Sequence, residues 1–337
     1  MTERVLVTGA SGVVGGAVAR GLIERGYHVR TLQRRELPKS LRGLGIEQVQ
    51  GDINDEEVQQ RACAEVDRVV HAAARVDVTG PWAEFERVNV RGTSAILEAA
   101  NRAGVRGFVL VSSPSVSHTG KALIGADADP AEPEHARSHY SRSKAMAEQL
   151  VLNPASDKKA GMARVAVRPH LVWGPGDTQL TQRIIDRARA SRLVVIGDGA
   201  ALIDTTYIDN AADAIIAALE RVEHPEVQGR AFVVSNGQPR TVVEMLTRIA
   251  RVAGLAGPKA RIPYPVARGA GHVLSAVWER TGREGDPVIT PFVAEQLATA
   301  HWFDQETTRR ALQWSPRVDI DEGFDRLAEF LRRGATT

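Results

Sequence analysis

Cysteine is almost absent from this sequence, because Cys63 is the only one among 337 residues. A single thiol excludes an internal disulfide and a metal site built from several thiolates, and it suits a reducing compartment. No apolar run is long enough to cross a bilayer, and no charged and then apolar leader precedes the first strand-like residues. We therefore expect a cytoplasmic protein without a transmembrane segment.

A surplus of one charge is also lacking. The 43 Lys and Arg residues nearly balance 41 Asp and Glu residues, which leaves a formal net charge of +2. Because the sequence has no run of Lys and Arg residues that would bind along a phosphate backbone, nucleic acid is not expected as a partner. No internal repeat or low-complexity linker interrupts the chain, and its content of 43% apolar and 25% charged residues is typical of a folded globular protein.

Short β-branched runs alternate with longer helical patterns through the first half of the chain. We predict strands over residues 5–7, 29–32, 48–50, 68–70, 108–111 and 164–167. We predict helices over residues 17–25, 83–103 and 141–152. This alternation is typical of an α/β protein with a doubly wound parallel sheet, the Rossmann arrangement, with helices on both faces.

After Pro169 the pattern changes to turns and helices, although residues 231–235 have the character of one more strand returning to the sheet. We therefore divide the chain into a dinucleotide-binding domain, residues 1–168 and 205–236, and a smaller, mostly helical substrate-binding domain, residues 169–204 and 237–337. A later segment has apolar residues at helical spacing, namely Val266, Ala270, Val273, Leu274, Val277 and Trp278. We expect this face to pack against its own domain, with a substrate-tunnel wall or a membrane-surface contact as alternatives.

A glycine-rich turn, residues 8–15, joins the first predicted strand to the first helix. Glycines permit the tight turn and allow backbone N–H groups to approach a pyrophosphate at the positive end of the helix. A turn of this kind is also found as a purely structural element, but its place between a strand and a helix favours a dinucleotide. The predicted contacts are Gly9, Ser11, Gly12, Val13, Val14 and Gly15.

The end of the second predicted strand distinguishes the two nicotinamide cofactors. NAD requires a carboxylate there for the ribose hydroxyls, whereas NADP requires cations for its phosphate. The sequence is Leu32-Gln33-Arg34-Arg35, without an acid, so we predict NADP(H) held by Arg34 and Arg35 in preference to NAD(H). The alternatives are two solvated surface arginines, or a Glu36 that turns back to the ribose.

Two further segments are predicted cofactor contacts from their position at strand ends. Asp52 and Ile53 follow the third strand and would bracket the adenine. The small residues Ala72, Ala73 and Ala74 end the fourth strand and would let the cofactor lie close to the sheet, although close packing explains the same alanines.

Tyr140 and Lys144 are four residues apart, and therefore on one face of a helix. A phenol with a pKa near 10 is a weak acid at neutral pH, and an adjacent cation favours its ionised form. Tyr140 would then give a proton to a carbonyl oxygen as hydride reaches the carbon. Ser113, at the end of the fifth strand, would donate a hydrogen bond to the same oxygen, and Lys144 would also hold the nicotinamide ribose.

No metal site is expected. His135 and His139 are one helical turn apart near Glu132 and Glu134, but no further ligand follows at a suitable spacing. His118 is expected in a loop.

The glycine-rich turn, Ser113 and the Tyr140 and Lys144 pair together resemble the extended short-chain dehydrogenase/reductases. The resemblance covers essentially the whole chain. Similarity to the 3β-hydroxysteroid dehydrogenase branch lies in residues 112–116, 168–177 and 204–210. Similarity to bacterial 2-alkyl-3-oxoalkanoate reductases of olefin biosynthesis lies in longer stretches that include residues 295–303. The resemblance implies that Ser113, Tyr140 and Lys144 are catalytic. It implies cofactor contacts at Ser112, Asn89, Pro169, His170 and Leu171. The residues expected to contact substrate are Ser113, Ser115, Tyr140 and Trp173.

Departures from sibling families sharpen the expected substrate. Dehydratases carry an acid pair beside the catalytic hydroxyl where this chain has Pro114 and Ser115, and epimerases usually carry Asn where His170 and Leu171 stand here. Both changes remove polar groups and favour an apolar substrate. We therefore expect NADPH-dependent reduction of a β-keto acid with long alkyl chains.

Three other functions stay open at this stage: an NAD-dependent 3β-hydroxysteroid or carboxysterol dehydrogenase, a nucleotide-sugar epimerase, and a non-enzymatic NADP-binding regulator. Besides a hydrophobic small molecule, the partner hypotheses are a second copy of the chain, other enzymes of an olefin pathway, and a peripheral contact with a membrane.

Overall fold

The fold is built on a seven-stranded parallel sheet. The computed structural model describes residues 2–77, 79–118, 120–153, 161–281 and 287–334. The strands run in the order β12-β7-β5-β4-β1-β2-β3, and every neighbouring pair is parallel. Their bounds are β1 (Arg4–Thr8), β2 (His28–Gln33), β3 (Glu47–Gln50), β4 (Arg68–His71), β5 (Gly107–Val111), β7 (Ala163–Pro169) and β12 (Ala231–Val234). The expected doubly wound α/β fold is confirmed.

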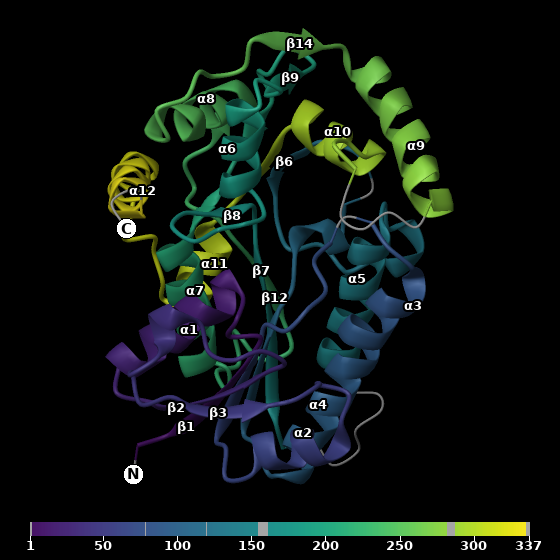
Figure 1. The fold of residues 1–337 in the computed structure, drawn as a ribbon. Helices are drawn as coiled ribbons and strands as arrows, with labels where there is room; N and C mark the ends of the chain where they lie inside the picture. The colour runs from purple at the N-terminus through teal and green to yellow at the C-terminus, as the bar shows by residue number, and fades with distance from the viewer. Residues whose placement is uncertain (1, 78, 119, 154–160, 282–286, 335–337) are drawn as a thin grey trace.

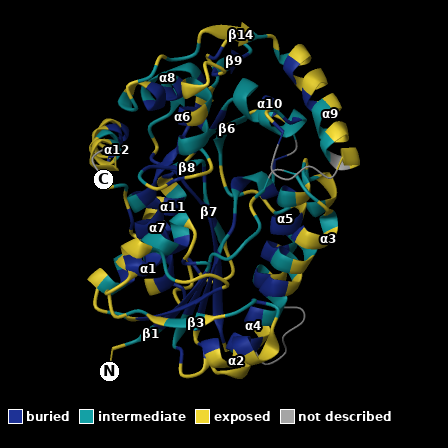
Figure 2. Cartoon of the chain, viewed as in Figure 1, coloured by how far each residue is buried: buried dark blue, intermediate teal, exposed yellow. Residues whose placement is uncertain are grey.

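Helices cover both faces of this sheet. Alternate residues of each strand point to opposite sides, so each face contributes apolar side chains to its own core. Val5 and Val7 of β1 belong to one core cluster and Leu6 to the other, and all three are fully buried. The first cluster packs beneath α1 (Val13–Glu24) and α7 (Ile208–Glu220), and the second beneath α2 (Glu56–Cys63) and α4 (Gly92–Arg102). Figure 2 shows the central strands of the sheet as the buried core of the molecule.

The helix predicted over residues 83–103 is continuous in space but not regular. It consists of α3 (Trp82–Phe85), a π-helical segment η2 (Glu86–Arg91) and then α4. Single π-helical turns often occur at functional positions, because the extra residue re-aims the side chains around it. Asn89 lies within η2 and is 1% exposed.

Most of the remaining elements form a cap over the carboxyl ends of the strands (Figure 1). A four-stranded sheet in the order β13-β10-β15-β6 is formed by β6 (Leu123–Ala126), β10 (Leu202–Ile203), β13 (Arg240–Thr241) and β15 (His301–Phe303). Two small pairs accompany it, β8 (Val172–Trp173) with β11 (Thr206–Tyr207), and β9 (Val194–Ile196) with β14 (Ala260–Ile262). The helices of the cap are α6 (Thr181–Arg189), α8 (Val242–Val252), α9 (Tyr264–Thr281), α10 (Pro291–Ala298) and α12 (Ile320–Gly334). α11 (Glu306–Leu312) packs instead against α7 and β12, beside the seven-stranded sheet. β6 therefore ties the first part of the chain into the cap.

The apolar face predicted in the C-terminal part lies on α9, but it does not pack as expected. Val266, Val273 and Val277 are 60%, 65% and 39% exposed, so the valines of this stripe face away from the domain, whereas Leu274 and Trp278 are half-buried. The packed side of α9 carries small residues instead. Ala267 is buried, and a Cβ added at Gly271 would lie 2.7 Å from the backbone nitrogen of Pro291 in α10. Small residues allow the two helices to approach closely, and this explains why the valines are left outside.

Among the described residues, none of the helices is both long and apolar enough to cross a membrane.

Candidate active site

One large cavity of about 640 Å³ lies where the sheet meets the cap. Its floor is formed by the carboxyl ends of β1, β2, β4, β5 and β7, the edge at which open parallel sheets bind ligands. Its outer part lies between α6 and α10. The floor and the outer part are one continuous space, so ligands bound in the two regions would meet.

The glycine-rich turn forms one end of the floor, and all six residues predicted there line the cavity. Gly9 has a φ of 74°, and a Cβ at this position would lie 2.7 Å from the Cα of Ala73. A Cβ at Gly15 would lie 2.5 Å from the carbonyl oxygen of Gly9. Gly12 caps α1 without a side-chain hydrogen bond, so the first N–H groups of the helix are available to an anion. The turn therefore fits a pyrophosphate.

The end of β2 carries a residue that the sequence analysis did not select. Gln33 is 5% exposed and lines the cavity, and neither atom of its amide has a hydrogen-bond partner among the described residues. A buried amide without partners is costly unless a ligand supplies them. Gln33 stands directly before Arg34, and its amide is suited to the hydroxyls or phosphate of an adenosine ribose. In the sequence, the only signal for Gln33 is its place as the last residue of β2, where the absence of an acid was the feature used for the prediction.

The two arginines that follow are not equivalent. Arg34 lines the cavity, whereas Arg35 is exposed and is not among its described lining residues. Glu36 forms an ion pair with Arg42 at 2.8 Å and is likewise outside the lining. The described lining of the cavity therefore includes Arg34 and includes neither Arg35 nor Glu36.

The adenine contacts predicted after β3 and the close cofactor approach predicted after β4 both fall on residues of the cavity wall. Asp52 and Ile53 line it, as do Ala72, Ala73 and Ala74. Burial alone would raise the pKa of Asp52, but hydrogen bonds from Asn54 and Arg87 outweigh it and hold the pKa below its ordinary value. Asp52 is therefore a carboxylate at neutral pH.

Asn89 is buried and is not among the described residues that line the cavity. Its Oδ1 accepts from the backbone N–H of Arg75 at 2.7 Å, and its Nδ2 donates to the Ser143 hydroxyl at 2.9 Å. Ser143 directly precedes Lys144 on α5 (His139–Leu152). The predicted direct contact with the cofactor is therefore corrected to a positioning role, because hydrogen bonds within the protein occupy the amide.

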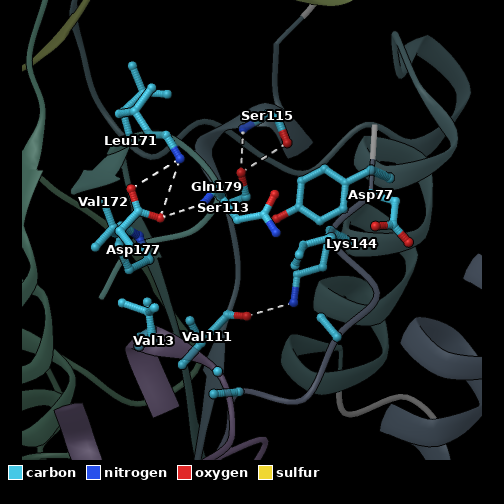
Figure 3. A pocket seen from close by; sticks show the side chains of 18 of the residues that line it. Val13, Asp77, Val111, Ser113, Ser115, Lys144, Leu171, Val172, Asp177 and Gln179 are labelled. Atoms are coloured by element: carbon cyan, nitrogen blue, oxygen red, sulfur yellow. Dashed lines mark hydrogen bonds between the residues drawn. The ribbon is translucent and has the colours of Figure 1, made fainter. Parts of the chain in front are cut away.

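The predicted catalytic residues Ser113, Tyr140 and Lys144 line the same part of the cavity. Ser138 caps α5 by accepting from the N–H of Ser141, and this fixes the first turn, where Tyr140 lies. The Lys144 side chain reaches back to the end of β5, where its Nζ donates to the carbonyl oxygen of Val111 at 2.6 Å (Figure 3). The helix and the strand thus bring the three side chains to one place.

A short chain of hydroxyl groups leads to Tyr140. Against the effect of burial, a hydrogen bond from Ser113 acts to lower the pKa of the Tyr140 phenol. The Ser113 Oγ lies 3.0 Å from the Ser115 Oγ and accepts the Ser115 N–H at 3.3 Å (Figure 3). Ser113 has one proton to donate, and when it goes to the phenol oxygen, the Ser115 hydroxyl becomes the donor between the two serines. The cooperative direction of this chain makes Ser113 a better donor.

The electrostatics of Tyr140 differ from the expectation. Burial raises the pKa of Tyr140, and the hydrogen bond from Ser113, rather than the charge of Lys144, is the opposing influence. Burial also lowers the pKa of Lys144 to about 8, against the charge of Glu148, which raises it. The predicted acidification of the phenol by Lys144 is therefore not found. Tyr140 is held protonated at neutral pH, which is the state required to donate a proton.

A buried ion pair joins the catalytic helix to the neighbouring strand. Arg168 of β7 and Glu148 of α5 are each 1% exposed, and they form two parallel contacts, with the Arg168 Nε at 2.9 Å from the Glu148 Oε2. Arg168 also donates to the carbonyl oxygen of Asp129 at 2.7 Å. The planar guanidinium and the carboxylate match each other, and each charge has its counter-charge.

The segment at the end of β7 lines the cavity only in its first half. Pro169, His170 and Leu171 line the cavity, and Leu171 has a left-handed φ of 43°, an uncommon conformation for a residue with a side chain. Trp173, predicted as a substrate contact, is fully buried in the core, where its ring packs 4.5 Å from that of Phe324. The pairing of β8 with β11 turns Trp173 away from the cavity, so that prediction is wrong.

The outer wall carries residues that no local motif predicted. Asp177 accepts from the N–H of Gln179 (Figure 3). It also accepts from the N–H of Thr181 and so positions the start of α6. The wall consists largely of apolar and basic side chains from α6 and α10 together with buried histidines, including Ile184, Phe292, Val293, Leu297, Arg183, Arg187, His118 and His301. They are brought together from distant parts of the chain, and no spacing in the sequence reveals this.

The described residues contain no cluster of three or more metal-binding side chains. His135 hydrogen bonds with Glu132 at 3.0 Å and His139 with the carbonyl oxygen of Gly80 at 3.1 Å, so the two histidines have separate partners.

A parallel Rossmann sheet with Ser, Tyr and Lys at its carboxyl edge defines an oxidoreductase of the extended short-chain dehydrogenase/reductase class. Within this class, the chain belongs to the 3-beta hydroxysteroid dehydrogenase/isomerase family, whose sequence model matches residues 6–265. The family resemblance inferred from the sequence is thereby confirmed.

Similar proteins span nearly the whole chain. A 2-alkyl-3-oxoalkanoate reductase of Stenotrophomonas maltophilia is 38% identical, over 96% of this chain and 98% of its own length. A protein of the same description from Shewanella oneidensis is 35% identical, over 96% of this chain and 85% of its own. Among solved structures, MoeE5 in complex with UDP-glucose and NAD is 24% identical and has a TM-score of 0.75, covering 98% and 99% of the two chains. This last likeness concerns the fold alone.

Proposed function

We propose that the protein reduces the ketone of a hydrophobic 2-alkyl-3-oxo acid to the alcohol, with NADPH as the hydride donor. The observation that carries the proposal is the junction of two regions in one cavity. The glycine-rich turn and Gln33 lie at one end, the outer apolar wall at the other, and Ser113, Tyr140 and Lys144 between them. The similarity to two 2-alkyl-3-oxoalkanoate reductases supports this substrate class.

The residues at the junction have distinct roles in this reaction. When bound, NADPH would supply the hydride. Tyr140 donates its phenolic proton to the carbonyl oxygen, and this balances the negative charge that the oxygen would otherwise acquire. With substrate bound, the Ser113 hydroxyl turns its single proton from the phenol to the same carbonyl oxygen and is itself polarised by Ser115. Lys144, whose Nζ donates to the Val111 carbonyl, would hold the nicotinamide ribose.

The cofactor preference rests on Gln33 and Arg34. An amide with two free atoms, followed by an exposed guanidinium at the cavity edge, suits a ribose that carries a phosphate. A carboxylate at this position would repel that phosphate. NAD in similar solved structures is a property of those proteins. The choice between NADP and NAD in this chain depends on its own residues.

The outer wall fits the rest of the substrate. Phe292, Val293 and Leu297 of α10 present apolar surface for alkyl chains. Arg183 and Arg187 lie one turn apart on α6 and both line the cavity. Burial and the charge of Arg183 lower the pKa of Arg187, so the two cations are close enough to repel each other. A negatively charged substrate group would relieve this repulsion.

The direct test is turnover. Purified protein is incubated with a 2-alkyl-3-oxo acid and either NADPH or NADH, and loss of cofactor absorbance at 340 nm is followed together with formation of the hydroxy acid. We expect turnover with a clear preference for NADPH. Absence of turnover, combined with oxidation of a 3β-hydroxysteroid by NAD, would replace the proposal with a steroid dehydrogenase.

The charge of the substrate is tested at Arg187. Replacing Arg187 with Gln should lower kcat/KM for the oxo acid by roughly 3- to 10-fold, because a partly exposed charge pair contributes modestly. The methyl ester of the same acid carries no charge and should be affected much less. Arg189 is exposed on the same helix and does not line the cavity, so the R189Q variant is the matched control. An equal loss for acid and ester would contradict the assignment.

A further inference from the structure

Two buried histidines meet at the outer wall of the cavity. His118 follows the segment that carries Ser113 and Ser115, and His301 is the first residue of β15, 183 positions away. They are 3% and 1% exposed, both line the cavity, and their Nε2 atoms are 2.9 Å apart. Such a short contact between two ring nitrogens requires that one carries a proton and the other does not.

The backbone decides which nitrogen carries the proton. The N–H of Gly120 donates to the His118 Nδ1 at 3.1 Å, so this atom is an acceptor. A neutral His118 therefore carries its proton on Nε2 and donates it to the His301 Nε2. His301, which accepts at Nε2, must then carry its own proton on Nδ1.

The neighbouring threonine agrees with this order. The Thr299 hydroxyl lies 3.2 Å from the His301 Nε2, but its only proton is donated to the carbonyl oxygen of Glu295 at 2.8 Å. It therefore leaves the His301 Nε2 as an acceptor for His118. The His301 Nδ1 has no hydrogen-bond partner among the described residues. A buried donor without an acceptor is unfavourable, and its persistence in a cavity wall indicates a ligand.

The position of His301 connects it with the reacting centre. Its ring centroid is 6.1 Å from that of His170, in the turn after β7. The backbone N–H of His118 donates to the carbonyl oxygen of Ser115 at 3.4 Å. Both histidines are thus attached to the segments that border Ser113. In a 3-oxo acid, the carboxyl group is only two bonds from the carbon that receives hydride, so it must lie close to these segments.

We propose that the His301 Nδ1–H donates a hydrogen bond to a carboxyl oxygen of the substrate and selects compounds that carry this oxygen beside the reacting ketone. The inference rests on the proposed function and assigns His301 as a specificity-determining residue of that site. His118 is a positioning residue, because it acts by setting the tautomer of His301.

The donor is independent of pH in the range where the protein would be assayed. The groups that face the pair are Glu295, Arg137 and His170. Burial lowers the pKa of His301 to about 3, helped by the neighbouring His170 and His118. Burial also lowers the pKa of His118, although Glu295 opposes it. Both rings are therefore neutral, and recognition depends on geometry rather than on charge.

Kinetics with three matched compounds test the contact. They are the 2-alkyl-3-oxo acid, its methyl ester, and the corresponding ketone without the carboxyl group. In the His301→Leu variant, the ratio of kcat/KM for acid or ester to that for ketone should fall by roughly 10- to 100-fold. His301→Asn retains an N–H donor and should restore part of this ratio. Equal losses for all three compounds would reduce His301 to a structural residue and overturn the inference.

Nitrogen NMR of the histidine rings tests the tautomer without any turnover. His301 should be in the Nδ1–H form in the wild-type protein. His118→Gln retains a donor toward His301 and should preserve this form, whereas His118→Leu should lose it. An Nε2–H form of His301 in the wild-type protein would overturn the inference even if the oxo acid is reduced. If the wild-type protein reduces none of the three compounds, the proposed function fails instead.

Discussion

Tyr140 and Lys144 are neighbours on α5, yet their polar atoms have different partners. Ser113 hydrogen bonds to the phenol, and the Val111 carbonyl accepts from the ammonium. At the scale of single residues, proton donation and cofactor positioning are therefore separable. Burial raises the pKa of the phenol, so the free protein is prepared for reduction, the direction in which the acid must hold its proton.

Replacing Tyr140 with Phe should lower kcat by roughly 100- to 10,000-fold, the usual contribution of a positioned acid. The dissociation constant for NADPH, measured by fluorescence titration, should change little because the ring remains. Tyr27 carries a phenol far from the cavity, hydrogen bonded to Glu220 at 3.4 Å, so the Y27F variant is the control. Unchanged turnover in Y140F would mean that another group is the acid.

Arg34 and Arg35 should differ although they are adjacent. Arg34→Ala should raise the KM for NADPH by roughly 10-fold or more, since a charge-assisted hydrogen bond to phosphate is lost. Arg35→Ala should have a much smaller effect, because Arg35 does not line the cavity. The KM for NADH is the internal reference for both variants. A larger effect at Arg35 would reverse the assignment.

Residues within continuous motifs could be predicted from the sequence, and residues that depend on long-range pairing could not. The glycine-rich turn and the spacing of Tyr140 and Lys144 are local, and the structure brings them to one cavity. Trp173 is in a matching stretch as well, but the pairing of β8 with β11 decides that it points into the core. His301 comes from a strand whose partners are distant in the chain, so no local pattern marks it.

At the scale of elements, α9 illustrates why an apolar pattern does not reveal what covers it. The predicted stripe is present, but Ala267 and Gly271 make the contact with α10, because helices approach most closely through small residues. The strands of the sheet were predictable for the opposite reason. The inner strands β1, β4 and β5 are buried on both faces, so every residue of their apolar runs is covered whichever side it faces.

The two sides of α9 should respond differently to substitution. Val273→Ser should change the free energy of unfolding by less than about 0.5 kcal/mol, because the side chain is 65% exposed. Ala267→Leu inserts volume into a packed contact and should destabilise the protein by about 1–3 kcal/mol. Chemical denaturation followed by circular dichroism measures both. A large effect of V273S would indicate that the stripe is covered in solution.

At the scale of the whole molecule, buried neutral histidines link stability to pH. Burial lowers the pKa of His71 and His301 to about 3 and that of His170 to about 4. In the unfolded chain the same groups titrate near pH 6.5, so below that pH the unfolded state binds more protons. Their stabilising contribution is complete above pH 6.5 and is lost as the pH falls toward these lower values.

The free energy of unfolding should therefore fall between pH 6.5 and about 4, by up to about 1.4 kcal/mol per pH unit for each histidine. Urea denaturation at several pH values measures this slope. His71→Gln should reduce the slope, whereas replacement of the exposed His272 with Gln should leave it unchanged. An identical slope in H71Q would remove His71 from the explanation.

The ion pair of Glu148 and Arg168 has a consequence for how such a protein can diversify. One partner belongs to the helix with the proton donor and the other to the strand that leads into the turn at the cavity, so neither can be exchanged alone without stranding a buried charge. The apparatus for hydride transfer is thus inherited as one block. The outer wall is joined to that block through Arg137, just before α5, and Glu295 of α10, 3.0 Å apart, but the Arg137 side chain of this pair is 40% exposed. The apolar residues Phe292, Val293 and Leu297 of α10 carry no charge, so new substrates can be acquired there while the chemistry beneath stays the same.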